Sequence, residues 1–392
     1  TLTGQSNNDQ FGHSISLSEN GETLAVGSPS SDIFNGNLVD AGQVSIFDIS
    51  GVENNWSQIG NNIQGGNAND QFGKSISLSA DGAVIAIGAP NSLNSPGEVT
   101  VYENSASSWD LKGSRIQGGE LNDDFGWSVD LSNNGSILVV GDPSYDAPTK
   151  ADSGIVKVYK YGVNNVNEWT QFGGSLYGLY GSSGFGYSVD LSPDGQLVAV
   201  GSPEKDLVDK NGRTSVYALQ NNELVKLGND ILGESLTDES GSSISLVNPD
   251  PTSINGALIA IGAQKNDGQN LLNSGHVRIY QYDNQNWVQY GNDIDGSSLG
   301  DLSAFDVNLS SNGQYLAVGS INHDYLTNPN SGQVRIFEYD STDSIWRQSG
   351  FDLGGLEEGD NFGQSLAFAN NGTSIAIGSA FAGNSDEGNV TV

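Results

Sequence analysis

The sequence contains no cysteine and no methionine among its 392 residues. Without cysteine the chain has no disulfide, no thiolate nucleophile and no cysteine-ligated zinc site, so its stability has to come from packing. The chain begins at Thr1 and has no methionine, which predicts that the start codon and any signal peptide lie outside this sequence. We therefore interpret the chain as a part of a larger protein.

Basic residues are also scarce. Lysine and arginine total 14 against 47 aspartate and glutamate residues, giving a formal net charge of −33 at pH 7. This charge repels phosphate backbones and anionic lipid surfaces, so nucleic acid is not an expected partner. No run approaches the roughly 18–20 consecutive apolar residues of a membrane-spanning helix, so we expect no membrane insertion by this segment. Hydrophobic residues still make up 35% of the chain, which predicts a folded protein.

A repeated segment runs through the chain seven times. Its first copy reads NDQFGHSISLSENGETLAVGSP. Five copies are marked by a phenylalanine–glycine pair, at Phe11-Gly12, Phe72-Gly73, Phe125-Gly126, Phe185-Gly186 and Phe362-Gly363. Two degenerate copies centre on Gly241 and Phe305.

Each repeat predicts four strands. Asn-Gly or Asp-Gly pairs such as Asn20-Gly21 indicate a tight hairpin between the first two strands. A third strand follows a glycine, and the fourth usually opens with tryptophan. The third strand is apolar on both faces, as at Val44, Ile46 and Phe47, so both faces are expected to be covered by neighbouring sheets.

Stacked four-stranded sheets around an axis are typical of a propeller. We predict an all-β fold, a seven-bladed β-propeller of four-stranded antiparallel blades, as one unit over residues 1–392. The blades start near residues 8, 69, 122, 182, 238, 301 and 359. A linear solenoid is the alternative architecture.

The FG pair followed by a VGSP, IGAP or VGDP segment resembles the FG-GAP repeat family, whose propellers also form the heads of integrin α-subunits. The resemblance implies a secreted or cell-surface protein that recognises other molecules. Calcium-binding members of that family carry an acidic DxDxDG-like loop between the first two strands. Here SENG, SADG or SPDG turns occupy that place, so this calcium site is not expected.

The last repeat is expected to lack a strand. It ends at Val392, at the end of its third strand, and the N-terminal TLTG aligns only with the tail of a fourth strand. An unpaired edge favours strand addition. We expect chain beyond Val392, a flanking domain or a neighbouring chain to complete blade seven, and we favour continuation of the same chain.

Two acidic positions recur in loops that should share one face of the propeller. One precedes the FG pair, at Asp9, Asp70, Asp123 and Asp360, and the other follows the GAP segment, at Asp32, Asp146, Asp206, Asp267 and Asp324. The simpler hypothesis is that these side chains close turns onto backbone amides. The alternative is that some of them bind Ca²⁺, the one metal cofactor we consider, with Asp142 and Asp146 of the GDPSYD motif as the richest candidates.

Tyrosines supply the candidate ligand contacts. Tyr177 and Tyr180 are flanked by glycines, and with Tyr145 they suit sugar stacking or protein contact. The three histidines, His13, His276 and His323, occupy different positions in their repeats and belong to no nucleophile motif, so they are interpreted as surface or packing residues.

The sequence favours a binding protein over an enzyme. The leading hypothesis is an extracellular adhesion or structural-interaction module that binds a protein or glycan on its acidic loop face, assisted by calcium in one version. One alternative is a lectin-like, carbohydrate-binding propeller. A further alternative is a polysaccharide-active enzyme, which would need a cluster of acidic or basic residues at the central cavity.

Overall fold

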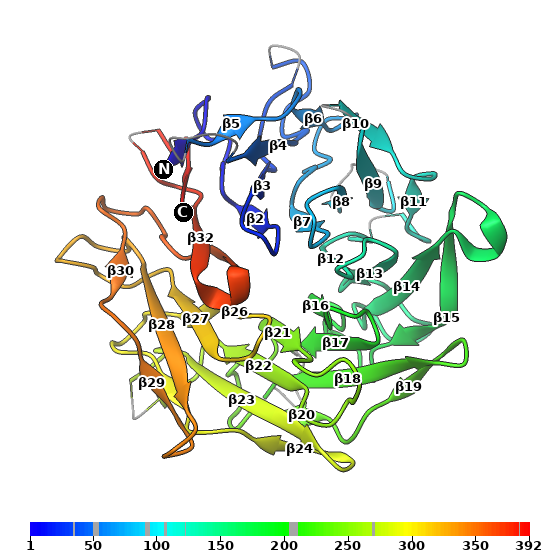
Figure 1. Cartoon of the computed structure of the whole chain (residues 1–392). Helices are drawn as coiled ribbons and strands as arrows, with labels where there is room; N and C mark the ends of the chain where they lie inside the picture. The colour runs from blue at the N-terminus through cyan, green and yellow to red at the C-terminus, as the bar shows by residue number, and fades with distance from the viewer. Residues whose placement is uncertain are drawn as a thin grey trace.

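Seven antiparallel sheets surround a central axis in the computed structural model of the chain (Figure 1). The structure describes residues 1–33, 36–49, 55–90, 95–105, 108–121, 123–203, 211–268, 271–383 and 385–392. The sheets follow one another around the axis in chain order, and each has four strands or four strands and a short tail. The predicted seven-bladed β-propeller is confirmed.

In every blade the first strand is innermost. The order outward follows the sequence in blades one to six, whereas the outermost strand of blade seven comes from the N-terminus of the chain. The first strands are β2 (Ser14–Leu17), β7 (Ser75–Leu78), β12 (Ser128–Leu131), β16 (Ser188–Leu191), β21 (Ser243–Val247), β26 (Ser303–Leu309) and β31 (Ser365–Ala369). The second strands are β3 (Thr23–Ser28), β8 (Val84–Ala89), β13 (Ile137–Asp142), β17 (Leu197–Ser202), β22 (Leu258–Ala263), β27 (Tyr315–Ser320) and β32 (Ser374–Ser379).

The outer strands complete each blade. The third strands are β4 (Gln43–Asp48), β9 (Glu98–Ser105), β14 (Ile155–Tyr161), β18 (Arg213–Gln220), β23 (His276–Asp283), β28 (Gln333–Asp340) and β33 (Asn389–Thr391). The fourth strands are β5 (Ser57–Gln58), β10 (Ser108–Leu111), β15 (Trp169–Tyr177), β19 (Glu223–Lys226), β24 (Asn286–Gln289) and β29 (Ile345–Gln348). In blade seven, β1 (Leu2–Thr3) is the fourth strand of the sheet and pairs at the position of a tail. Five fourth strands continue into a tail that pairs with the start of the third: β6 (Ile63–Gln64), β11 (Ile116–Gln117), β20 (Ile231–Leu232), β25 (Ile294–Asp295) and β30 (Leu353–Gly354).

Helical structure is minimal. Two 3₁₀ turns are described, η1 (Val163–Asn165) and η3 (Asn370–Gly372). Among the described residues there is no helix of the length and apolar character that crossing a membrane requires.

The predicted hairpins between first and second strands form through a side-chain bridge. Asn20 accepts hydrogen bonds from the Ser18 hydroxyl at 2.7 Å and from the Glu22 amide at 3.0 Å, while Gly21 takes a positive φ of 71°. The same serine–Asx arrangement recurs at Ser79–Asp81, Ser132–Asn134, Ser192–Asp194 and Ser310–Asn312. These turns are closed by their own side-chain hydrogen bonds.

The FG and GAP glycines lie where adjacent blades touch. The Gly126 amide donates to the Gly141 carbonyl within blade three, at 3.1 Å. The Gly126 carbonyl faces blade two, where a Cβ added to Gly88 would approach this oxygen to 2.1 Å. The Ser75 hydroxyl donates to the same carbonyl at 2.8 Å. The motif therefore encodes close backbone contact between blades.

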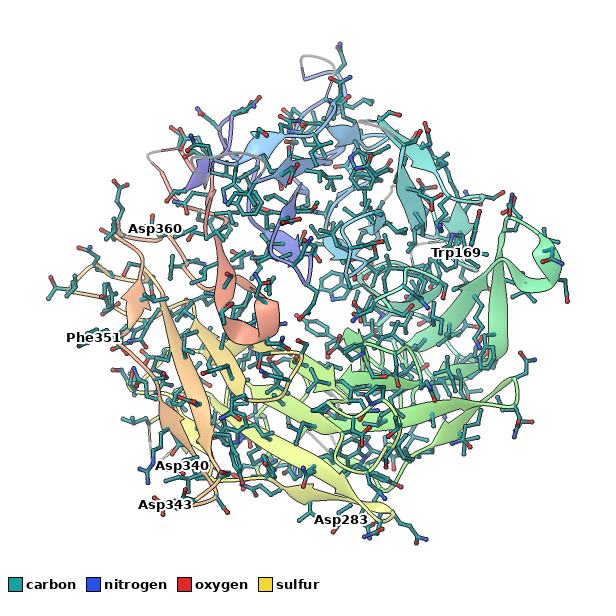
Figure 2. The ribbon with its side chains drawn as sticks, viewed as in Figure 1. Trp169, Asp283, Asp340, Asp343, Phe351 and Asp360 are labelled. Atoms are coloured by element: carbon teal, nitrogen blue, oxygen red, sulfur yellow. The ribbon has the colours of Figure 1, made fainter. Side chains whose placement is uncertain are left out.

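The core is divided into clusters between neighbouring blades. One cluster joins Val84 and Ala86 of blade two to Val129 and Leu138 of blade three, and six others repeat this plan around the ring. Trp169 closes the outside of this cluster, where its indole nitrogen donates to the Lys112 carbonyl of blade two at 2.8 Å (Figure 2). The fourth-strand tryptophan therefore has a structural role at this position.

The two ends of the chain meet in blade seven (Figure 1). Leu2 pairs with Val390 and Thr3 with Asn389, where the tail strands pair in other blades, and the Gly4 amide donates to the Gly388 carbonyl at 2.9 Å. The alignment of TLTG with a fourth-strand tail is thus confirmed. The sheet of blade seven reaches four strands through the chain's own N-terminus. Addition of a further strand after Val392 stays a prediction.

Candidate binding face

The propeller has two chemically different faces. We call the face formed by the loops that join second to third strands, and fourth strands to the next blade, the loop face. Its exposed aliphatic side chains, among the described residues, are Val39, Leu121, Leu179, Leu236, Leu272, Leu299, Leu326 and Leu356. On the hairpins of the opposite face, the described residues include one exposed large aliphatic side chain, Val166.

The outer rim carries charged and polar hairpins. Asp340 and Asp343 of blade six both pair with Arg347, and Asp283 ends the third strand of blade five on the same rim (Figure 2). Exposed ion pairs of this kind contribute little to stability. Phe351 is an exception on this rim, at 93% exposed (Figure 2).

One residue from each blade lines the mouth of the axial channel, a cavity of about 330 Å³. These residues follow the FG pair or its equivalent: His13, Lys74, Trp127, Tyr187, Ser242, Phe305 and Gln364. The Lys74 ammonium lies 4.8 Å from the centre of the Trp127 ring, and the Tyr187 ring lies 5.5 Å from it on the neighbouring blade. The repeat therefore places different chemistry at equivalent positions, with aromatic side chains gathered at blades three and four.

A second cavity, of about 430 Å³, lies beside this aromatic pair, between blades three and four. Asp124, Ser144 and Asp152 line it together with Trp127 and Tyr187. Prolines and short polar residues complete the wall: Pro143, Ser182, Ser183, Gly184 and Pro203. The cavity thus combines two aromatic rings with two carboxylates, and none of the described residues that line it is basic.

The carboxylates at this cavity are only partly compensated. Burial raises the pKa of Asp124. The Ser144 hydroxyl, which donates to it at 2.5 Å, lowers this pKa, the charge of Asp152 raises it again, and the charge of Lys74 lowers it. Behind it, burial raises the pKa of Asp142 to about 7, with the charge of Asp123 as the next cause. Burial likewise raises the pKa of Asp123 to about 6. A positively charged ligand group would relieve this repulsion.

The exposed aspartates after the GAP segment close their own loops. Asp146 accepts from the Asp152 amide at 2.8 Å and Asp267 from the Asn273 amide at 2.9 Å. Asp32 and Asp324 accept from the amides of Asp40 and Asn330, each at 3.0 Å. Asp206 lies outside the described residues. These contacts are the ones expected if the aspartates close turns onto backbone amides. Calcium binding at these positions stays a prediction.

The aspartates before the FG pair are buried and bond to the loop that precedes them. Asp70 accepts hydrogen bonds from the Gly66 and Asn67 amides, at 3.1 and 2.7 Å. Asp360 does the same with Leu356 and Glu357. Repetition of these acids therefore follows repetition of the loop.

The three candidate tyrosines separate into two places. The rings of Tyr145 and Tyr177 meet in blade three with centroids 5.9 Å apart. Tyr180 lies instead beneath the Arg213 guanidinium of blade four, 5.6 Å from ring centre to charge. Trp127 and Tyr187, which no motif in the sequence singles out, lie together because they directly precede the first strands of two neighbouring blades.

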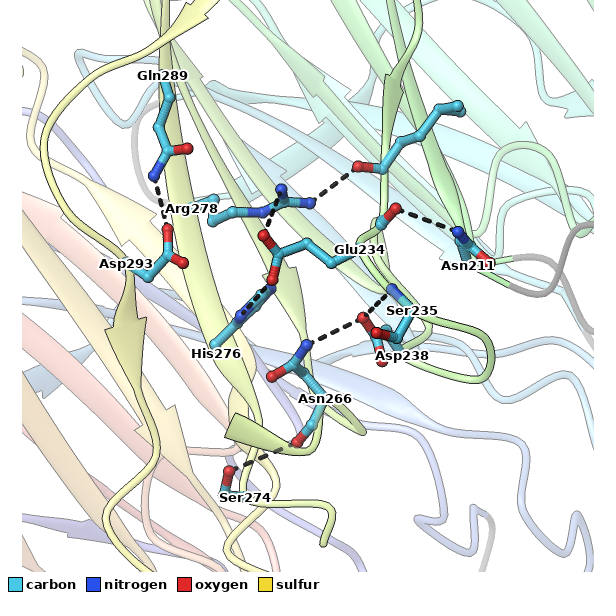
Figure 3. A network of polar contacts seen from close by, with 12 residues as sticks. Asn211, Glu234, Ser235, Asp238, Asn266, Ser274, His276, Arg278, Gln289 and Asp293 are labelled. Carbon is cyan, nitrogen blue, oxygen red and sulfur yellow. Dashed lines mark hydrogen bonds and ion pairs between the residues drawn. The ribbon is translucent and has the colours of Figure 1, made fainter. Parts of the chain in front are cut away.

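A cluster between blades four and five was also missed (Figure 3). Ligand atoms of Glu234, His276 and Asp293 lie within 4.8 Å of one another. Among the described residues, no other three histidines or acids are grouped this closely. Burial, followed by the charge of Arg278, lowers the pKa of His276. The three residues come from a loop, a third strand and a turn, so no local motif in the sequence reveals them.

No protein-family model matches the chain, and no curated protein matches it. The resemblance to FG-GAP repeats therefore rests on the motifs and on the contacts that they make.

Proposed function

We propose that this propeller is an extracellular binding module of the FG-GAP type, which docks a macromolecular ligand on its loop face. The observation that carries the proposal is the one-sided distribution of exposed aliphatic side chains. Leu236, Leu299 and Leu356, in loops that lead from one blade to the next, are 62%, 67% and 77% exposed. Exposed apolar groups rimmed by polar residues mark interaction surfaces.

Neighbouring loops support continuity of this surface. The Gly300 amide, next to Leu299, donates to the Leu272 carbonyl at 2.9 Å. Asn328 donates to the Leu356 carbonyl at 2.7 Å, close in sequence to Leu326. Exposed leucines of adjoining loops are therefore held near one another by polar contacts. A ligand that spans several blades would cover them together.

The centre of the face suggests the chemistry of the ligand. Asp124 and Asp152 lie at the same cavity as Trp127 and Tyr187, and their charges repel each other. A lysine or arginine side chain of a protein partner would pair with the carboxylates and contact an aromatic face. We therefore propose a protein ligand with basic residues inside an apolar rim.

The test uses a screen of proteins and basic peptides against the immobilised chain, followed by two matched triple variants. Leu236→Ser, Leu299→Ser and Leu356→Ser together should weaken binding of an identified protein at least tenfold. The control variant combines Leu111→Thr, Val225→Thr and Val288→Thr, which change exposed positions on fourth strands. Equal loss in both variants, or loss in the control alone, would exclude the loop face.

A glycan ligand is the second candidate, favoured by the aromatic pair at the cavity. A sugar ring would stack on Trp127 or Tyr187 and donate hydroxyl hydrogen bonds to Asp124 and Asp152. A glycan array probed with the chain and with Trp127→Ala distinguishes the two. If the chain binds a glycan and Trp127→Ala does not, the ligand is a sugar and the proposal of a protein ligand is wrong.

A further inference from the structure

We infer that Glu234, His276 and Asp293 form a binding site for one divalent transition-metal ion, which ties a loop of blade four to blade five. Glu234 follows the tail strand β20 of blade four, His276 begins β23, and Asp293 precedes β25 in blade five (Figure 3). An imidazole with two carboxylates is a ligand set of Zn²⁺ and Mn²⁺ sites.

The spacing suits one ion. The Nδ1 atom of His276 and the Oε2 atom of Glu234 are 4.0 Å apart, beyond hydrogen-bond distance. Metal–ligand bonds of about 2.0–2.2 Å allow two ligands of one ion to be up to about 4.2 Å apart. All three ligand atoms lie within 4.8 Å of one another, so small rotations of the partly exposed carboxylates close the set.

The buried imidazole is independent support for a ligand. His276 is 2% exposed, and in the described part of the chain no hydrogen bond reaches its ring nitrogens. A buried polar group normally has a partner. Its Nδ1 atom faces the carboxylate of Glu234, and the gap between them is the position that an ion would occupy (Figure 3).

Each carboxylate is oriented by a donor on one oxygen. Arg278 pairs with the Oε1 atom of Glu234 at 3.3 Å, which leaves Oε2 toward His276. Gln289 donates to the Oδ1 atom of Asp293 at 2.6 Å, which leaves Oδ2 for the ion (Figure 3). Donors that hold the outer oxygens of ligating carboxylates are a regular feature of metal sites.

The loop that carries Glu234 is fixed before any ion binds. Arg278 donates to the Leu232 carbonyl at 2.8 Å, and Asn211 donates to the Gly233 carbonyl at 3.3 Å. Asp238 accepts from the Ser235 amide and from the side chain of Asn266, each at 2.9 Å (Figure 3). Binding therefore requires little ordering of the chain.

Other blades lack this combination at the equivalent positions. Glutamine stands at Gln43 and Gln333 where blade five has His276, and Asn62 stands where it has Asp293. In blade one the side-chain amide of Asn62 donates to the side-chain oxygen of Gln43 at 2.8 Å. A direct hydrogen bond there takes the place of the ion that we infer in blade five. These blades supply substitutions that a propeller blade accommodates.

The experiment titrates the chelator-treated full chain with Zn²⁺ by calorimetry and with Co²⁺ by visible absorption. We expect one equivalent, with a Co²⁺ spectrum that reports nitrogen ligation, and a higher unfolding midpoint in the presence of Zn²⁺. His276→Gln and Asp293→Asn should each weaken this binding at least tenfold while leaving the metal-free unfolding midpoint within a few degrees.

His323→Gln is the matched control, because His323 contacts Asp301 at 3.1 Å outside this cluster. This control should bind Zn²⁺ like the unaltered chain. Absence of a stoichiometric Zn²⁺ site, or unchanged affinity in His276→Gln, would overturn the inference. Binding of Ca²⁺ in preference to Zn²⁺ at these residues would also overturn it, because Ca²⁺ selects oxygen ligands.

Discussion

At the scale of single residues, equivalent positions in the repeat carry unlike chemistry. The second strand ends in a small residue in six blades, at Ser28, Ala89, Ser202, Ala263, Ser320 and Ser379, but in Asp142 in blade three. Asp142 is 1% exposed and accepts a hydrogen bond from the Asp124 amide at 3.2 Å. Burial removes the carboxylate of Asp142 from water, and the charge of Asp123 lies nearby, so both effects raise its pKa.

Asp142→Asn should stabilise the protein at alkaline pH. The carboxyl pKa is about 7 in the folded protein against an ordinary value of 3.8, so the folded state binds the proton more tightly. The contribution of Asp142 to stability is therefore largest at low pH and falls as pH rises from about 4 to 7. The asparagine cannot ionise and keeps the bond to Asp124. We expect a gain on the order of 2 kcal/mol at pH 8 and little change at pH 4.

Urea unfolding of both proteins across this pH range measures the difference. Asp146→Asn serves as the control, because Asp146 is exposed and its contact with the Asp152 amide survives in the amide side chain. A stabilisation that does not depend on pH would contradict ionisation of Asp142 as its cause.

At the scale of strands and turns, the glycines explain why the repeat can be recognised in the amino-acid sequence. Gly88 lies against the Gly126 carbonyl of the next blade, and Gly141 lies in the same way against Gly186. In blade six the FG pair is replaced by Ser303-Ala304, and the Ala304 carbonyl remains at the same contact with Gly262. The motif is therefore determined by how closely the backbones of two neighbouring blades approach, more than by the identity of its side chains.

Gly88→Ala should destabilise the propeller by more than about 3 kcal/mol. Its Cβ would be 2.1 Å from the Gly126 oxygen and 2.4 Å from the Ser75 hydroxyl oxygen, so two blades would have to separate. Gly119→Ala is the control, since a Cβ there meets nothing within 4 Å. Thermal unfolding should show a large decrease for the first and almost none for the second. Similar midpoints would mean that blades shift easily.

The same elements show what sequence can and cannot supply. Hairpins, third strands and blade boundaries follow from local patterns, because Asn20-Gly21 and its equivalents specify turns without reference to distant residues. The loop-closing partners of Asp146 and Asp267 are also local. Trp127 meets Tyr187, and Glu234 meets His276, across blade boundaries, so their proximity depends on the packing angle between blades.

At the scale of the whole molecule, a closed ring removes the exposed edges that isolated sheets present. Blades one to six are joined in sequence, but the contact between blades seven and one depends on both ends of the chain. Leu2 belongs to the buried cluster that contains Phe11 and Val390, and β1 pairs with β33 beside it. The ring is therefore closed by two residue pairs of β1 and β33 together with the apolar cluster that blades seven and one share.

Deletion of residues 1–4 should destabilise the chain by about 2–4 kcal/mol, because strand hydrogen bonds contribute about 1 kcal/mol each and Leu2 loses buried area. It should also uncover β33 and favour association of chains through this edge. Thermal unfolding and light scattering measure the two effects. Thr1→Ala, which removes only the exposed contact of Thr1 with the Thr391 hydroxyl, is the control. An unchanged midpoint after deletion would show that packing between blades seven and one closes the ring without β1.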